Sequence, residues 1–173
     1  KSCLSYTFSV SNSQGTSLIK DRPFTAEMTR SIMLLKEKPY RPRMADYRIG
    51  VFFTGREQLG EGAKTTAPVY YANRWDIQPS DTAAYLRGEK VKPTKQIVFY
   101  IDNTFPEKWK PYLREGVTQW NELFEQIGFK DVVAAKDFPT DDPEFDPDNI
   151  KYSCVRYAPS SIENAMGPSW VDP

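Results

Sequence analysis

The chain has 173 residues, of which 39% are hydrophobic and 14% aromatic, so it can build an apolar core in one large domain or two small ones. It has no run near the ~20 apolar residues that a membrane-spanning helix needs. It also has no histidine, which excludes an imidazole base, a Ser-His or Cys-His nucleophile pair and a histidine-bound metal within these residues.

The formal net charge of zero hides two oppositely charged halves. Residues 1–92 carry 15 Lys and Arg against 9 Asp and Glu, whereas residues 93–173 carry 8 against 14. This change of sign near Lys92 predicts two structural units that meet there. We therefore expect a β-rich domain over residues 1–92 and a second domain over residues 93–173.

The first half of the chain has the patterns of β-strands. Apolar residues alternate with serine and threonine from Leu4 to Val10, which is the period of a half-buried strand. Residues 12–15 then predict a turn. With three further predicted strands, the pattern indicates an antiparallel β unit over about residues 3–80. These three strands cover residues 29–36, 47–54 and 69–77.

Residues 96–135 predict a strand over 97–102, a helix, and a second strand over 131–135. Pro106 and Pro111 both suit a first helical position, so we expect a short turn over 105–110 and the main helix from about Pro111. Gly128 is expected in the left-handed conformation just past the helix, where Phe129 can contact Phe124. We expect a glycine on the buried face to allow close approach to a sheet. The predicted buried face contains Leu113, Gly116, Val117, Trp120, Phe124 and Ile127, widened by Trp109 and Tyr112.

An acidic loop over residues 137–149 precedes a predicted strand over 150–157 and an irregular segment over 158–173. Oxygen-rich loops can hold calcium, but this spacing fits no EF-hand and three prolines interrupt it, so a solvated loop is favoured. The two cysteines, Cys3 and Cys154, cannot form a disulfide framework. Buried free thiols are favoured over a bridge between them.

Two further patterns have both a functional and a structural interpretation. Residues 40–48 interleave arginine with tyrosine, as nucleic-acid-binding surfaces do. Asp46 lies among these arginines and the net charge is zero, so a structural ion pair is favoured and no nucleic-acid partner is expected. Glycoside hydrolysis needs two carboxylates across a cleft, and nothing in the sequence places two together. The carboxylates considered are Asp102, Glu107 and Glu163.

Short motifs follow one another along most of the chain: Tyr47-Arg48-Ile49-Gly50-Val51-Phe52, Asn73-Arg74-Trp75, Val98-Phe99-Tyr100-Ile101-Asp102, Glu115-Gly116-Val117, Trp120-Asn121, Phe124-Glu125, Gly128-Phe129-Lys130 and Met166-Gly167-Pro168-Ser169. In order and spacing, this series resembles the large zinc-dependent metalloproteases of Bacteroidetes-type bacteria, whose catalytic part is metzincin-like.

The resemblance implies an α+β fold with a particular layout. Residues 1–92 would be the C-terminal part of a β-rich domain that precedes the protease domain. Residues 93–173 would be the N-terminal part of the catalytic domain, with its first strand, its long helix across the sheet and its next strands. The zinc of the full-length parent would be held by an HExxH-type helix that follows the sheet, with its glutamate as general base. No zinc ligand and no catalytic residue is carried over onto this sequence.

The resemblance also implies where substrate would lie. Metzincins bind an extended peptide against an edge strand of the sheet. In this sequence the segment nearest to that edge is expected at residues 164–170. The substrate-binding candidates are Asn164, Ala165, Met166, Gly167, Ser169 and Trp170.

We therefore expect a fragment of a periplasmic, outer-membrane-anchored or secreted zinc metalloendopeptidase that is inactive alone. Its partners would be a peptide or protein substrate and the remainder of the catalytic domain, and any export signal would lie outside this sequence. The alternative is a non-catalytic module that binds peptide or glycan at the bacterial surface. A parent that keeps the fold as a scaffold but has lost activity is a third possibility.

Overall fold

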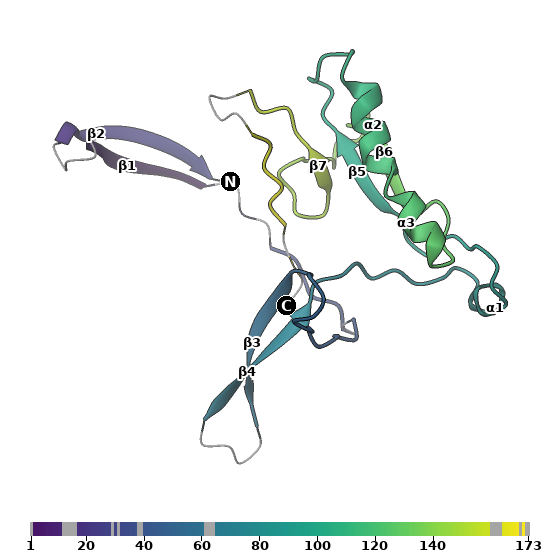
Figure 1. Cartoon of the computed structure of the whole chain (residues 1–173). Coiled ribbons are helices and arrows are strands. Elements are labelled where there is room, and N and C mark those ends of the chain that lie inside the picture. Colours follow the sequence, from purple (N-terminus) through teal and green to yellow (C-terminus); the bar gives the residue numbers. More distant parts are fainter. Residues whose placement is uncertain are drawn as a thin grey trace.

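The computed structural model describes residues 2–11, 17–28, 30, 32–37, 40–60, 65–159, 164–169 and 171. It contains antiparallel and parallel sheets together with short helices (Figure 1), which agrees with the expected α+β class. None of the helices in these residues is long and apolar enough to cross a membrane. The helices are α1 (Thr82–Leu86), α2 (Lys110–Thr118) and α3 (Asn121–Gln126).

Two antiparallel hairpins make up the sheets of the first half. Strand β1 (Ser2–Ser11) pairs with β2 (Ser17–Met28), and β3 (Phe53–Leu59) pairs with β4 (Thr66–Ala72). Within the described residues these are separate two-stranded sheets rather than one unit. The first strand is confirmed inside β1, while the predicted turn at 12–15 falls outside the described residues.

Where the structure describes it, the predicted strand over residues 29–36 is wrong. The described residues 32–36 have no regular structure, and Ile32 and Leu34 are 99% and 95% exposed. The register explains this difference, because Met28 already lies opposite Ser2 at the start of β1. The chain after β2 therefore runs past the end of its partner strand and finds no ladder there.

The third and fourth strands are displaced from their predicted positions. The amide of Ile49 donates to the Asp46 carbonyl at 3.0 Å, and the amide of Arg48 donates to the Asp46 carboxylate at 3.0 Å. Aspartate side chains commonly bond to nearby backbone groups and so compete with strand formation. The local turn at Asp46 therefore prevails over the alternating pattern, and β3 begins only at Phe53. On the other side, β4 ends at Ala72, five residues before the predicted end at Ile77.

A parallel three-stranded sheet forms in the second half, in the order β6-β5-β7. Strands β5 (Ile97–Ile101), β6 (Val133–Asp137) and β7 (Ser153–Val155) run in the same direction. The helices α2 and α3 connect β5 to β6, and α2 packs on both strands (Figure 1). The strand–helix–strand prediction is confirmed, although β6 begins two residues later than expected.

The end of α3 forms as predicted. Gly128 has φ of 87°, the amide of Phe129 donates to the Phe124 carbonyl at 3.0 Å, and the amide of Gly128 donates to the Glu125 carbonyl at 3.2 Å. These two bonds constitute a Schellman motif. Phe129 is buried and Phe124 packs against its cluster, which supplies the hydrophobic contact that accompanies this cap.

The predicted buried face of the helix is partly wrong. Leu113, Val117 and Phe124 are half-buried as expected, but Trp120 and Ile127 are 60% and 56% exposed. The long helix is also divided at residues 119–120, where the backbone stays helical but α2 ends and α3 begins. Between Val117 and Phe124, the position that faces the sheet is occupied by the polar residue Asn121. Gly116, Trp109 and Tyr112 are exposed as well, so Gly116 does not serve an approach to the sheet.

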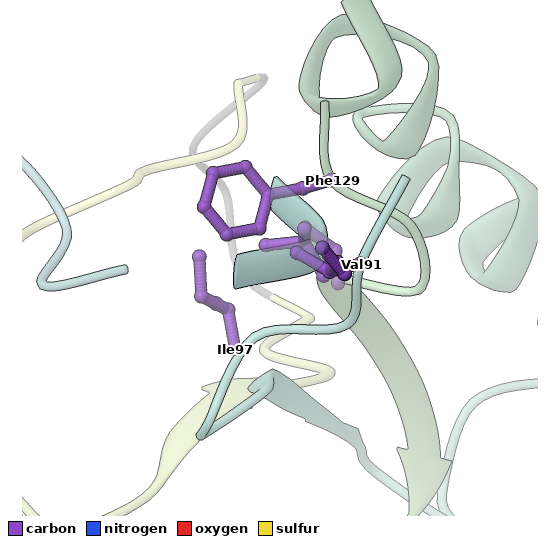
Figure 2. Packing of buried hydrophobic residues seen from close by; sticks show 6 residues of the cluster. Val91, Ile97 and Phe129 are labelled. Carbon is purple, nitrogen blue, oxygen red and sulfur yellow. The ribbon is translucent and has the colours of Figure 1, made fainter. Parts of the chain in front are cut away.

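The core lies where α1 and its flanking segments meet the sheet and the end of α3. In Figure 2 the side chains of Val91, Ile97 and Phe129 point toward one another. Val91 and Ile97 lie on either side of the predicted domain boundary at 92–93, which stays a prediction. The buried cluster consists of Ala84, Val91, Ile97, Phe129, Val132 and Val133.

Candidate functional site

The carboxyl end of the parallel sheet is the place to look for a site, because open α/β sheets bind ligands beyond the carboxyl ends of their strands. Asp102 follows β5 directly. Its carboxylate accepts hydrogen bonds from the Thr104 amide at 2.9 Å, the Thr104 hydroxyl at 2.8 Å and the Tyr157 amide at 3.3 Å. Since Tyr157 follows β7, this one side chain connects the exits of two neighbouring strands.

These contacts fix the ionisation of Asp102. Partial burial raises the pKa of the carboxyl, but the hydrogen bonds from Thr104 and Tyr157, together with the charge of Arg156, outweigh it and hold the pKa below its usual value. A carboxylate whose two oxygens already accept bonds from its own chain is suited to positioning rather than to proton transfer. Asp102 therefore acts as a structural clamp.

Four other acidic residues near this end of the sheet also have partners within the chain. Arg114 donates to both carboxylate oxygens of Asp137 at 2.5 and 2.7 Å, which ties α2 to the end of β6. Arg156 donates to Asp148 at 2.5 Å. In the loop between them, Asp142 and Asp146 accept bonds from backbone amides two residues further along, as Asx turns do.

The acidic loop also carries aromatic side chains that pack on the sheet. The Phe145 ring lies 4.7 to 5.1 Å from the rings of Tyr152, Phe138 and Tyr100, measured between centroids. The part of the chain that the structure describes includes the whole loop and holds no group of three or more His, Cys, Asp or Glu suited to a metal. Four of its acidic residues thus form turns or ion pairs around an aromatic anchor, namely Asp137, Asp142, Asp146 and Asp148.

The described candidates that remain, Glu107 and Cys154, do not form a site with Asp102. Glu107 accepts a hydrogen bond from the buried Lys110 at 2.6 Å and, within the described residues, shares no hydrogen-bond partner with the Asp102 side chain. Glu163 lies outside the described residues. Cys154 carries a free thiol on β7. Burial raises the pKa of this thiol, so the reactive thiolate is disfavoured.

The predicted ion pair of Asp46 is confirmed. Arg48 donates from Nε at 2.9 Å and from a terminal nitrogen at 2.6 Å, in a two-pronged contact with the carboxylate. The side-chain bond from Arg48 lowers the pKa of Asp46. Arg74, which lies outside residues 40–48, is placed over the ring of Tyr40, 4.2 Å from its centroid, so Tyr40 also has a partner within the chain.

The proposed substrate-binding segment does not form a strand in the residues described. Asn164, Ala165, Met166, Gly167 and Ser169 are exposed and irregular. Trp170, the last member of this set, lies outside the described residues. The role of this segment stays a prediction.

Asn121 has a structural role that the sequence pattern did not predict. Its side-chain oxygen accepts from the amides of Val132 and Val133, both at 2.8 Å, and its side-chain nitrogen donates to the Val133 carbonyl at 2.9 Å. These three bonds attach α3 to the start of β6, and they explain why a polar residue faces the sheet. The signal in the sequence was an asparagine at a position where the helical period calls for an apolar side chain.

Comparison with known proteins gives one match. Residues 1–80 match a family model described as a domain of unknown function (DUF5117). No curated protein and no solved structure matches the chain. The match covers both hairpins of the first half and stops before α1, so the parallel sheet and its helices lie beyond it.

Proposed function

We propose that this chain supplies part of the supporting layer of a periplasmic, outer-membrane-anchored or secreted zinc metalloendopeptidase. The observation that carries the proposal is the order of elements after residue 96. Strand β5, helices α2 and α3, strand β6 and strand β7 follow one another as the metzincin-like resemblance implies. The helix crosses between neighbouring parallel strands, as a supporting helix of such a domain should.

The motifs behind the resemblance supply a second argument, because several of their residues hold the scaffold together. Asn121 connects α3 to β6, Gly128 and Phe129 end α3, and Asp102 connects the exits of β5 and β7. Residues with such roles are needed for the architecture itself. They therefore support a relationship in fold, on which the proposed activity of the parent depends.

Zinc does not fit the donor groups of this chain. The sequence has no histidine, and Cys154 is a half-buried thiol with a raised pKa. In the described residues no cluster of three potential ligands exists. The proposal therefore assigns the zinc ligands and the general base to residues of the parent outside these 173. The role left to this chain is to hold the sheet, with residues 164–170 approaching the bound peptide.

An activity assay on two lengths of polypeptide tests this proposal. The 173-residue chain with added zinc should leave a mixed peptide library intact, while a longer polypeptide from the same gene should hydrolyse it. A chelator should abolish the hydrolysis, and zinc should restore it. Chelator-sensitive hydrolysis by the 173-residue chain alone would contradict the proposal, as would inactivity of every longer polypeptide.

A non-catalytic peptide- or glycan-binding module is the second candidate. The observation that favours it is the exposure of aromatic side chains in the described residues, among them Trp75 at 54% and Tyr112 at 71%. Such side chains stack readily on sugars and peptides. The reading frame after Pro173 separates the two proposals, since a histidine-bearing HExxH sequence favours the peptidase and a stop codon favours the module.

A further inference from the structure

The outward face of α2 and α3 carries an apolar stripe that the proposed activity does not use. Its five large side chains are 53–71% exposed, although each belongs to or borders a helix that packs on the sheet through its other face. Exposed apolar groups of this size and continuity commonly mark an interaction site. The stripe consists of Trp109, Tyr112, Trp120, Leu123 and Ile127.

The stripe is straight because its members recur with the helical period. With Gly116 included, the steps between successive positions are three, four, four, three and four, and the backbone angles stay helical through Gln119 and Trp120. Trp109 and Ile127 are 18 residue steps apart, for which the helical rise corresponds to about 27 Å. That length matches a partner helix of similar size lying along the stripe.

Gly116 divides the stripe at its centre. A Cβ atom at this position would meet no described atom within 4 Å, so the space above the glycine is open. Tyr112 and Trp120 stand one turn away on either side. Small residues between large ones form a notch that receives a side chain of a facing helix and lets the two backbones approach.

The charges beside the stripe are acidic. Glu115 and Glu122 flank it two turns apart, and neither forms an ion pair with any residue that the structure describes. Glu122 also lines a shallow hollow together with Gln119, Trp120 and Leu123. Lys108, which lies over the Trp109 ring, places a positive charge at the opposite end. A matching partner therefore needs basic groups opposite the middle and the C-terminal end of the stripe.

We propose that this stripe is the docking site for an amphipathic helix whose apolar face is bordered by lysine or arginine. The apolar stripe, the notch at Gly116 and the uncompensated carboxylates each specify one property of that partner. Helices dock by laying an apolar face along such a surface, with anchors at helical spacing. Its three aromatic anchors would each bury roughly 150–250 Å² in full and are 53–71% exposed, so the stripe still offers a few hundred Å², the size of many functional patches on monomers.

Two synthetic helical peptides test the docking site on the intact 173-residue chain. Both are 18 residues long with the same leucine face, which is bordered by lysine in one and by glutamate in the other. Titration calorimetry should give a dissociation constant on the order of 10 μM for the lysine peptide, which is typical of a small interface. The glutamate peptide should bind roughly tenfold more weakly, since its charges face Glu115 and Glu122.

Variants of the chain separate specific docking from nonspecific hydrophobic binding. The double change Glu115→Lys and Glu122→Lys touches exposed side chains and should reverse the preference, so that the glutamate peptide binds more tightly. Leu123→Asp should weaken binding of the lysine peptide by about tenfold, because it places a charge in the stripe. Leu86→Asp is the matched control, since Leu86 is 79% exposed on α1, and it should leave binding unchanged.

The proposal is overturned if the unmodified chain binds neither peptide, if it binds both equally, or if the double variant keeps the original preference. Light scattering adds one further outcome. Self-association that Leu123→Asp abolishes, without binding of either peptide, would show that a second copy covers the stripe instead. Peptidase activity is not measured in any of these experiments, so the result is independent of the proposed function.

Discussion

The unit around the parallel sheet and the β3–β4 hairpin differ in how they are held together. In the first, side chains bond to backbone groups of other elements, as Asn121 and Asp102 do, and a buried cluster lies beneath. In the hairpin, Val69, Tyr71 and Ala72 are half-buried on β4, but every residue of β3 except Thr54 is exposed. An isolated two-stranded sheet is marginal in water. The sheet unit therefore contains a buried cluster and side-chain bonds of its own, whereas the hairpin is supported mainly by backbone bonds from residues 43–45 to β4.

Among the polar contacts of the sheet unit, the side chain of Asn121 should cause the largest loss of stability when it is removed. Asn121→Ala leaves the amides of Val132 and Val133 without their partner, and these two residues are only 0% and 6% exposed. Unpaired buried amides are costly, so we expect the free energy of unfolding to fall by about 3 kcal/mol. Urea unfolding followed by circular dichroism measures this loss.

Two further variants serve as controls for the loss of stability expected from Asn121→Ala. Asn121→Asp keeps the acceptor for both amides and should lose roughly half as much. Asn103→Ala removes a single exposed bond to the Phe138 carbonyl and should cost less than about 1 kcal/mol. Equal losses for Asn103→Ala and Asn121→Ala would show that α3 is not attached to β6 in the way described.

A smaller loss is expected from substitution of the glycine that ends α3. Gly128 has φ of 87°, and a Cβ atom there would lie 2.9 Å from Cε2 of Tyr85. Backbone strain and this contact should together destabilise Gly128→Ala by about 2 kcal/mol. Gly88→Ala is the matched control, because Gly88 has φ of 84° but no described atom within 4 Å of the added Cβ, so it should cost only about 1 kcal/mol.

The two glycines also show which part of the fold was predictable. The cap at Gly128 and the strand β5 follow from local signals, namely a glycine after a helical pattern and a short run of β-branched and aromatic residues. The position of Asn121 in the helical period marks it as unusual, but its partners were not predictable, because they lie on β6, 11 or 12 residues away. The rotation of the helix was missed for the same reason. Apolar residues fill two adjacent faces, and the bonds of Asn121 decide which one meets the sheet.

The candidate site was less predictable than the fold. Residue type and position at a strand end make Asp102 a candidate catalytic carboxylate in the sequence. Its contact with the amide of Tyr157, 55 residues along the chain, makes it a structural clamp instead. No local sequence pattern predicts a contact over that separation. Only the resemblance predicts a role for residues 164–170, and it does not specify their conformation.

The clamp at Asp102 predicts a pH dependence of moderate size. The folded-state pKa of Asp102 is lowered from its ordinary value of 3.8, so its stabilisation is complete above that pH and is lost as the pH falls through the folded-state pKa. Asp102→Asn should lower the free energy of unfolding by about 1 kcal/mol at pH 7. The difference between the two proteins should shrink as the pH falls below 3.8. A difference that stays constant down to pH 2 would argue against an ionised clamp.

The smallest effect is expected in the hairpin. Leu59 lies at the end of β3 and is 75% exposed, so Leu59→Ala removes little buried surface. The free energy of unfolding should change by less than about 0.5 kcal/mol, as for most exposed positions.

Ile101→Ala is the contrasting variant, because Ile101 is 0% exposed on β5 and its truncation should cost about 2–5 kcal/mol. If Leu59→Ala destabilised the chain as much as Ile101→Ala, β3 would have to be covered in solution, and the contrast between the two regions would disappear. Hydrogen exchange of the β3 and β5 amides gives an independent measure, with slower exchange expected in β5.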